Sequence, residues 1–139
     1  MPTFKFAKNR PVGEIVNVYT LIDLCISSNS INSNTKFFKE FDPTIPEIRL
    51  NVNLFIKLLN KVYESLSENS EITTIISFKV GEYIKFDGVK HSLFTVEVKG
   101  ELFKNSYEHV ILELCEKNGF SSNIKSGAIL INIPMITEQ

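Results

Sequence analysis

The sequence has few of the residues and motifs on which enzymes and metal sites depend. Its 139 residues include no tryptophan, two cysteines, two histidines and six glycines. The glycines are scattered, so there is neither a Walker-type phosphate loop nor a G-x-G-x-x-G turn, and the G-x-S-x-G elbow of serine hydrolases is also missing. No catalytic, metal or phosphate-binding motif is recognisable, and we expect no cofactor.

A surplus of charge of one sign is also missing. Fifteen basic and 16 acidic residues give a net charge of −1 and a pI of about 6.1. Nucleic acid is therefore not an expected partner, because neutralising phosphates supplies most of the affinity of duplex-binding domains. No run approaches the ~20 apolar residues that span a bilayer, and the first residues do not resemble a secretory leader. We expect no membrane partner and a cytoplasmic location.

The two cysteines, Cys25 and Cys115, both lie in apolar helical patterns. A free cysteine commonly behaves as a small buried hydrophobe, and two cysteines 90 positions apart do not make a disulfide framework. We expect two buried thiols, with a disulfide as the alternative. With 43% apolar residues, including eleven phenylalanines, the chain is long enough to bury a core, and we expect residues 1–139 to form a single domain.

Residues 71–134 carry the clearest structural pattern. Apolar residues at every second position predict one buried face of a sheet from Ile72 to Val80 and again from Phe94 to Val98. Gly81 is expected to make a hairpin turn that pairs Val80 with Ile84, so this region predicts three antiparallel strands. A last strand over 128–133 is apolar on both faces, which is typical of an internal strand.

Helical spacing of apolar residues predicts helices over 15–26, 53–66 and 107–118. We expect Asn53 and Asn105 to cap the second and third of these helices, and Gly119 to end the third. Short strands are expected over 3–7 and 48–52, with a loop over 27–35. The predicted order is β-α-β-α-β-β-β-α-β, an α+β fold with a mixed, mainly antiparallel sheet and about three helices on one face.

The scarce histidines offer one candidate for chemistry. His109 and Glu113 are four residues apart on a predicted helix, and His91 lies near a predicted hairpin. A metal site needs a third ligand in space, which nothing in the spacing demands, so we expect no metal site. The alternative is a small enzyme or small-ligand-binding protein with a site near these two histidines.

The segment Phe37, Phe38, Glu40, Phe41 and Asp42 is the candidate partner-binding site, because three aromatic residues lie within five positions among charged ones. Their alternative role is to fill the core or cover a sheet end. The sequence as a whole then favours a small protein-binding module without catalytic activity. One concrete form is a bacterial immunity protein that binds and neutralises a cognate toxin, and a homo-oligomer that pairs through a sheet edge is a further alternative.

Overall fold

A computed structural model describes residues 13–86 and 88–137. The helices are α2 (Val18–Ser30), α3 (Val52–Ser65) and α4 (Glu108–Asn118), and the short 3-10 helix η1 (Asn105–Tyr107) precedes α4. The strands are β1 (Glu14–Val16), β2 (Lys36–Phe41), β3 (Ile48–Leu50), β4 (Glu71–Phe86), β5 (Val89–Lys99), β6 (Ser121–Lys125) and β7 (Ala128–Pro134). Among these described residues, no helix is long and apolar enough to cross a membrane.

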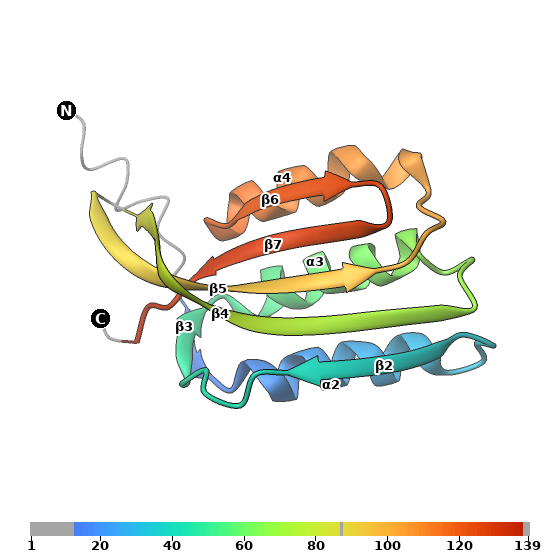
Figure 1. Ribbon diagram of the computed structural model, residues 1–139, viewed down its shortest axis with the longest axis horizontal. Coiled ribbons are helices and arrows are strands. Elements are labelled where there is room, and N and C mark those ends of the chain that lie inside the picture. Colours follow the sequence, from blue (N-terminus) through green and yellow to red (C-terminus); the bar gives the residue numbers. More distant parts are fainter. Residues whose placement is uncertain (1–12, 87, 138–139) are drawn as a thin grey trace.

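The strands form a five-stranded sheet in the order β2-β4-β5-β7-β6 and a two-stranded ribbon of β1 and β3. The edge strand β2 runs parallel to β4, and the other neighbours in the large sheet are antiparallel. The three α-helices lie behind one face of this sheet and leave its other face open (Figure 1). The predicted α+β class, with a mixed sheet and helices on one side, is confirmed.

The core lies between the helices and the inner face of the sheet. Its centre includes Phe55 and Leu58 of α3, Phe94 of β5 and Ile131 of β7, all with no exposed surface. Alternation along the strands and helical spacing along α3 place these residues on facing surfaces, as the sequence pattern predicted. The internal position of β7, between β5 and β6, is confirmed as well.

The predicted hairpin at Gly81 is wrong. β4 continues through Gly81 to Phe86, and a bulge between Lys79 and Tyr83 absorbs the extra residues in the pairing with β5. Gly81 has φ of +80°, which suits a bulge as well as a turn. The expected pairing of Val80 with Ile84 does not form, and Val80 is 80% exposed. The region therefore holds two long strands, whose far ends extend beyond the sheet as a twisted arm (Figure 1).

Two predicted helix caps are also wrong. Asn51, not Asn53, caps α3, because its side chain accepts a hydrogen bond from the backbone of Leu54 at 3.1 Å. Asn105 begins the 3-10 helix η1 and caps no α-helix. The end of α4 is confirmed: Gly119 has φ of +79°. The backbone N–H of Phe120 donates to the carbonyl of Cys115 at 2.9 Å, so Phe120 folds back onto the helix.

Further differences concern the chain between the main elements, among them the strand β2, which was not predicted. β1 replaces the expected first turn of a helix at residue 15, and α2 continues to Ser30 into the expected loop. The strand β6 was not predicted, because the polar sequence 121–125 has only Ile124 as an apolar residue. The strand predicted over 3–7 lies outside the described residues.

Candidate functional site

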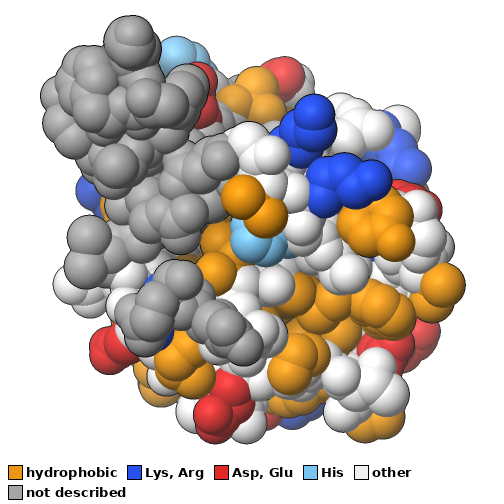
Figure 2. Space-filling view, turned by 90° about the vertical axis from the view of Figure 1, so that its left-hand side faces the viewer, with side chains coloured by type: hydrophobic (Ala, Val, Ile, Leu, Met, Phe, Trp, Pro, Cys, Tyr) orange, Lys and Arg blue, Asp and Glu red, His pale blue; other side chains and the backbone are white. Residues whose placement is uncertain are grey.

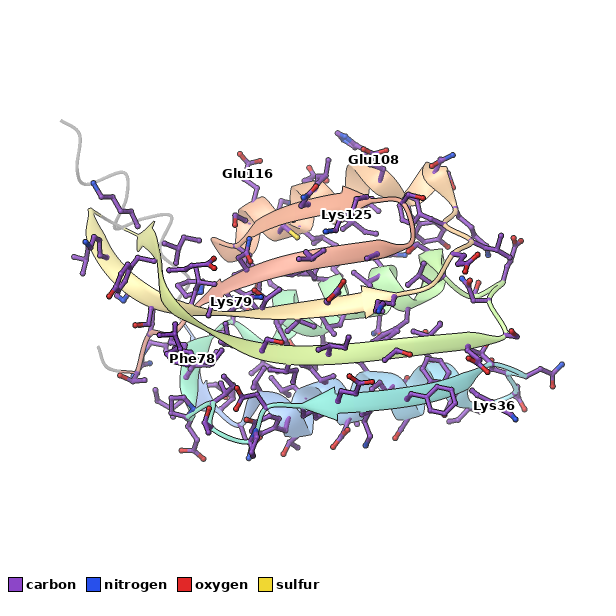
Figure 3. The ribbon with its side chains drawn as sticks, in the orientation of Figure 1. Lys36, Phe78, Lys79, Glu108, Glu116 and Lys125 are labelled. Atoms are coloured by element: carbon purple, nitrogen blue, oxygen red, sulfur yellow. The ribbon has the colours of Figure 1, made fainter. Side chains whose placement is uncertain are left out.

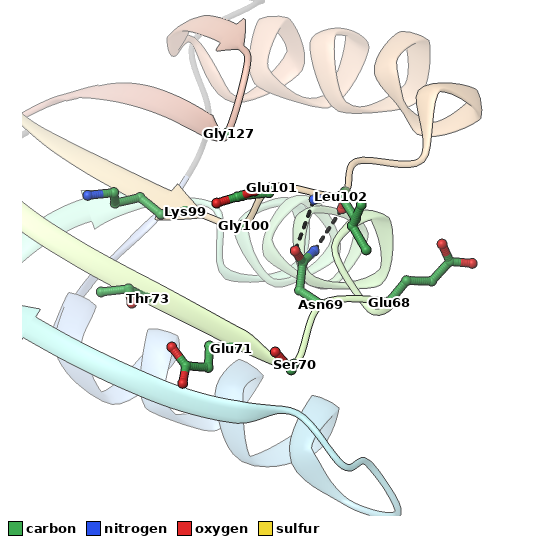
Figure 4. Close-up of a pocket in the computed structure, with 10 residues that line it drawn as sticks. All are labelled: Glu68, Asn69, Ser70, Glu71, Thr73, Lys99, Gly100, Glu101, Leu102 and Gly127. Atoms are coloured by element: carbon green, nitrogen blue, oxygen red, sulfur yellow. Dashed lines mark hydrogen bonds between the residues drawn. The ribbon is translucent and has the colours of Figure 1, made fainter.

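A hollow lies at the end of the sheet where α3 turns into β4. It has a volume of about 760 Å³. Three segments line it: residues 68–73 at the start of β4, residues 99–102 at the end of β5, and Gly127 in the turn between β6 and β7. We call it the acidic pocket, since Glu68, Glu71 and Glu101 are three of its four charged residues and Lys99 is the fourth (Figure 4).

Asn69 holds the floor of the acidic pocket in place. Its side-chain nitrogen donates to the carbonyl of Leu102 at 2.7 Å, and its side-chain oxygen accepts from the backbone N–H of Leu102 at 2.9 Å (Figure 4). A Cβ atom at Gly100 would lie 3.0 Å from the same amide, so this position favours glycine. The amide of Asn69 is therefore used to join two loops, and the glycine makes room for it.

The segment between β5 and α4 is closely tied to the last turns of α3. The backbone N–H of Lys104 donates to the carbonyl of Ser65 at 2.9 Å, and its ammonium group donates to the hydroxyl of Ser67 at 2.9 Å. The hydroxyl of Tyr107 donates to the carboxylate of Glu64 at 3.4 Å. These contacts hold the segment over the C-terminal end of α3, next to the acidic pocket.

The candidate partner-binding residues form the edge strand β2 and the turn after it. The ring of Phe37 contacts Tyr63 edge-on, and the ring of Phe41 stacks on Tyr19, each with centroids 5.9 Å apart. These two phenylalanines are half-buried, whereas Phe38 is 45% exposed on the open face of the sheet. Whether this segment binds a partner stays a prediction.

The two acidic candidates of the same segment differ in their contacts. Glu40 is exposed on β2. The carboxylate of Asp42 accepts hydrogen bonds from the hydroxyl and the backbone N–H of Thr44, at 2.6 and 2.9 Å. These bonds hold the pKa of Asp42 below its usual value. Asp42 therefore shapes the turn, and Glu40 stays available to solvent.

The two histidines do not meet. His91 lies at the arm end of β5 and His109 lies in the first turn of α4, at opposite ends of the sheet (Figure 1). A hollow of about 500 Å³ beside His109 is lined by Glu113 and Glu116 but not by His91. No group of three metal-binding side chains occurs within residues 13–86 and 88–137. The two cysteines are free and buried, as expected.

The arm end of the molecule carries exposed apolar side chains. Figure 2 looks at the arm end of the molecule and shows hydrophobic side chains dispersed among lysines and neutral polar groups. Exposed apolar residues of the arm include Tyr83 and Val89, with Lys90 placed over the Tyr83 ring at 4.8 Å. The acidic pocket, at the other end of the sheet, is therefore the best-formed candidate site for a small molecule.

No known protein family and no curated protein sequence matches this chain. Its fold, however, matches many solved structures. The Acinetobacter baumannii histidine kinase AdeS matches with a TM-score of 0.68 and 6% identity, over 96% of this chain and 74% of that one. The mycobacterial sensor histidine kinase MprB matches with a TM-score of 0.65 and 10% identity, over 91% and 100%.

A further match is full-length ShkA, which was solved in complex with AMPPNP. Its TM-score is 0.65 at 11% identity, and the match covers 96% of this chain and 34% of that one. At such low identities these matches show the fold alone, and that fold is the one of histidine kinase catalytic domains.

These matches overturn the hypothesis of an immunity protein that neutralises a toxin. The matched fold spans 91% of this chain and the whole of the solved MprB chain. The sequence had favoured a small protein-binding module without catalytic activity, because motifs were missing and a sheet face was expected to be open. Neither feature distinguishes a binding module from a domain with a kinase-type fold. His91 and His109 do not share a site, and a small-ligand site at His109 alone, where Glu113 and Glu116 line the same hollow, stays a prediction.

Sequence reasoning did not find the acidic pocket. Its charged residues come from two segments about 30 positions apart, and in the sequence they look like ordinary solvated charges; they are Glu68, Glu71, Lys99 and Glu101. One signal was present: Gly100 directly follows a strongly alternating strand. A glycine at a strand end often marks a close approach of another segment, which here is Asn69.

Proposed function

We propose that this chain is a nucleotide-binding domain of the histidine kinase catalytic type, and that its ligand is a nucleoside triphosphate such as ATP. The observation that supports this most is the extent of the fold match, because 96% of the chain superposes on ShkA, which was solved with the ATP analogue AMPPNP. The name histidine kinase describes an enzyme that takes a phosphoryl group from ATP, so the ligand class follows from the same comparison.

The residues of the acidic pocket fit a nucleotide that carries a divalent cation. A bare triphosphate is repelled, since the lining has three carboxylates and one lysine. Mg²⁺ is typically held by one or two carboxylates together with the phosphates themselves, and the carboxylates Glu71 and Glu101 would supply such oxygens. Lys99 would supply a positive charge to a phosphate oxygen. The pocket volume of about 760 Å³ lies within the range of small-molecule sites.

Titration calorimetry with ATP and AMPPNP, with and without Mg²⁺, tests this function. We expect binding that requires Mg²⁺ and that weakens about tenfold in Lys99→Gln, because one charge-assisted contact is removed. Lys125→Gln is the matched control, since Lys125 is an exposed lysine on the neighbouring strand β6 outside the pocket lining.

Absence of binding by either nucleotide at millimolar concentration, with Mg²⁺ present, would contradict the proposal. The chain would then have a kinase-type fold without the ability to bind a nucleotide. If Lys99→Gln and Lys125→Gln change the affinity for the nucleotide by the same factor, the nucleotide binds elsewhere on the molecule. A cytoplasmic location is part of the proposal, because ATP is abundant there and both thiols are free.

A further inference from the structure

The edge formed by β2 and α2 exposes apolar side chains on both sides of a strand that, among the described strands, pairs with β4 alone. Phe38 of β2, Leu24 of α2 and Ile31 at the end of α2 are 45%, 56% and 69% exposed. β2 is the last strand of the sheet on this side. Such an edge is a template for pairing with another strand, because no described strand bonds to its outward N–H and C=O groups.

The hydrogen bonds to β4 show which backbone groups of β2 point outward. The N–H of Lys36 donates to the carbonyl of Ser70, and the N–H of Asp42 donates to the carbonyl of Ile76, both at 2.9 Å. In a parallel pair, alternate residues direct both their N–H and C=O to the same neighbour. Even-numbered residues of β2 therefore bond to β4, and Phe37, Lys39 and Phe41 direct their backbone groups to the open edge.

The side chains alternate in the same way between the two faces. Phe37 and Phe41 point to the helices, where they contact Tyr63 and Tyr19. Lys39 points to the same side and forms an ion pair with Asp23 of α2 at 2.8 Å. Lys36, Phe38 and Glu40 therefore share the open face, as a positive, an aromatic and a negative side chain in sequence.

We propose that β2 pairs antiparallel with β2 of a second copy of this chain, around a two-fold axis at Phe38. The pairing places Phe37 of one copy opposite Lys39 of the other, so that residues with outward backbone groups exchange hydrogen bonds. On the open face, Phe38 lies opposite Phe38 of the second copy. Lys36 lies opposite Glu40 of the second copy, once on each side of the axis. The edge is thus complementary to itself in both hydrogen bonding and charge.

The helix behind β2 supports this pairing. In a continuous sheet the two α2 helices come side by side, because each lies directly behind its own β2 (Figure 1). The exposed residues Thr20, Leu24, Ser27 and Ile31 are spaced four, three and four positions apart, so they form one stripe on α2. The two small side chains, Thr20 and Ser27, allow a close approach of the helices, and Leu24 and Ile31 bury apolar surface between them.

The other edge of the sheet lacks this combination. β6 runs from Ser121 to Lys125, and none of its residues is among the exposed large apolar side chains of the described chain. Lys36 and Lys125 lie on the two opposite edges of the sheet (Figure 3). Lys125 is also exposed, which makes it a matched control for a charge reversal on β2.

Sedimentation equilibrium of the full chain and its charge-reversal variants tests the proposal. We expect a dimer for the wild type and at least a tenfold weaker dimer for Lys36→Glu and for Glu40→Lys, because each variant places like charges opposite each other twice. An equimolar mixture of the two variants restores opposite charges at both positions, so a heterodimer of wild-type strength is expected. Lys125→Glu is expected to dimerise like the wild type.

Three results would overturn this inference. They are a wild type that is monomeric up to millimolar concentration, variants that dimerise as strongly as the wild type, and a mixture that stays monomeric. Circular dichroism of each variant checks that the monomer is folded, which we expect since both side chains are exposed. The inference does not depend on nucleotide binding, and loss of ATP binding leaves the expected association unchanged.

Discussion

At the scale of single residues, the buried polar groups of this chain serve internal contacts. The hydroxyl of Tyr63 hydrogen bonds to that of Thr74 at 2.7 Å, and both residues are almost fully buried. Burial raises the pKa of the Tyr63 hydroxyl, so it stays neutral. Asn69 likewise joins two loops. The sequence pattern identified the apolar members of this core, but it could not show that Tyr63 and Thr74 meet, because their contact depends on how α3 lies against β4.

The two thiols give a prediction at this scale. Burial raises the pKa of both Cys25 and Cys115 to about 11 from 9.0. At pH 8 the folded protein then holds about a hundredfold less thiolate at each site than an ordinary thiol would, and thiolate is the reactive form. We expect iodoacetamide to label both cysteines slowly in buffer and rapidly in urea, as measured by mass spectrometry.

The same shift has a consequence for stability. The pKa of both thiols is higher in the folded state than in the unfolded state, so their neutral form contributes to the free energy of unfolding. This contribution is complete below pH 9 and is lost as the pH rises from about 9 to about 11. Rapid labelling of either cysteine in the native protein at pH 8 would contradict the buried position of that thiol.

At the scale of elements, strongly periodic segments were predicted well and their ends were not. α3 and β7 lie where the apolar spacing indicated. Asn51 and Asn53 are both plausible caps in the sequence, and only the backbone geometry shows that α3 begins at Val52. The continuous β4 was missed for a similar reason, because a glycine in a bulge and a glycine in a turn both have positive φ.

Alanine substitution distinguishes the two asparagines. Asn51→Ala is expected to lower the free energy of unfolding by about 1 kcal/mol, since the first turn of α3 loses its side-chain acceptor. Asn53→Ala is the matched control and is expected to change it by less than about 0.5 kcal/mol, because Asn53 is exposed within the first turn. Urea unfolding followed by circular dichroism measures both, and equal effects would contradict the assigned cap.

At the scale of the whole molecule, the fold class was predictable and the kinase-type topology was not. The order of strands depends on β2, whose aromatic residues suggested a surface patch and not a strand parallel to β4. The proposed nucleotide site was out of reach for the same reason, because the acidic pocket forms only after two distant segments of the chain come together. Patterns along a chain report local structure, whereas pairing and pockets depend on which segments become neighbours.

One hydrophobic core joins α2, α3 and α4 with the inner face of the large sheet. We therefore expect one cooperative unfolding transition, in keeping with the prediction that residues 1–139 form a single domain. Far-ultraviolet circular dichroism and tyrosine fluorescence are expected to give the same midpoint in urea. Two separated midpoints would show that part of the chain unfolds on its own.

The parallel alignment of β2 with β4 also affects the order in which the molecule can be assembled. Lys36 pairs with Glu71, 35 positions further along the chain, so β2 has no neighbouring strand until α3 has been made and has crossed over. Contacts at such separations form slowly, whereas the β4–β5 hairpin is local and forms quickly. During synthesis, β2 therefore cannot pair until the segment that forms β4 has been made.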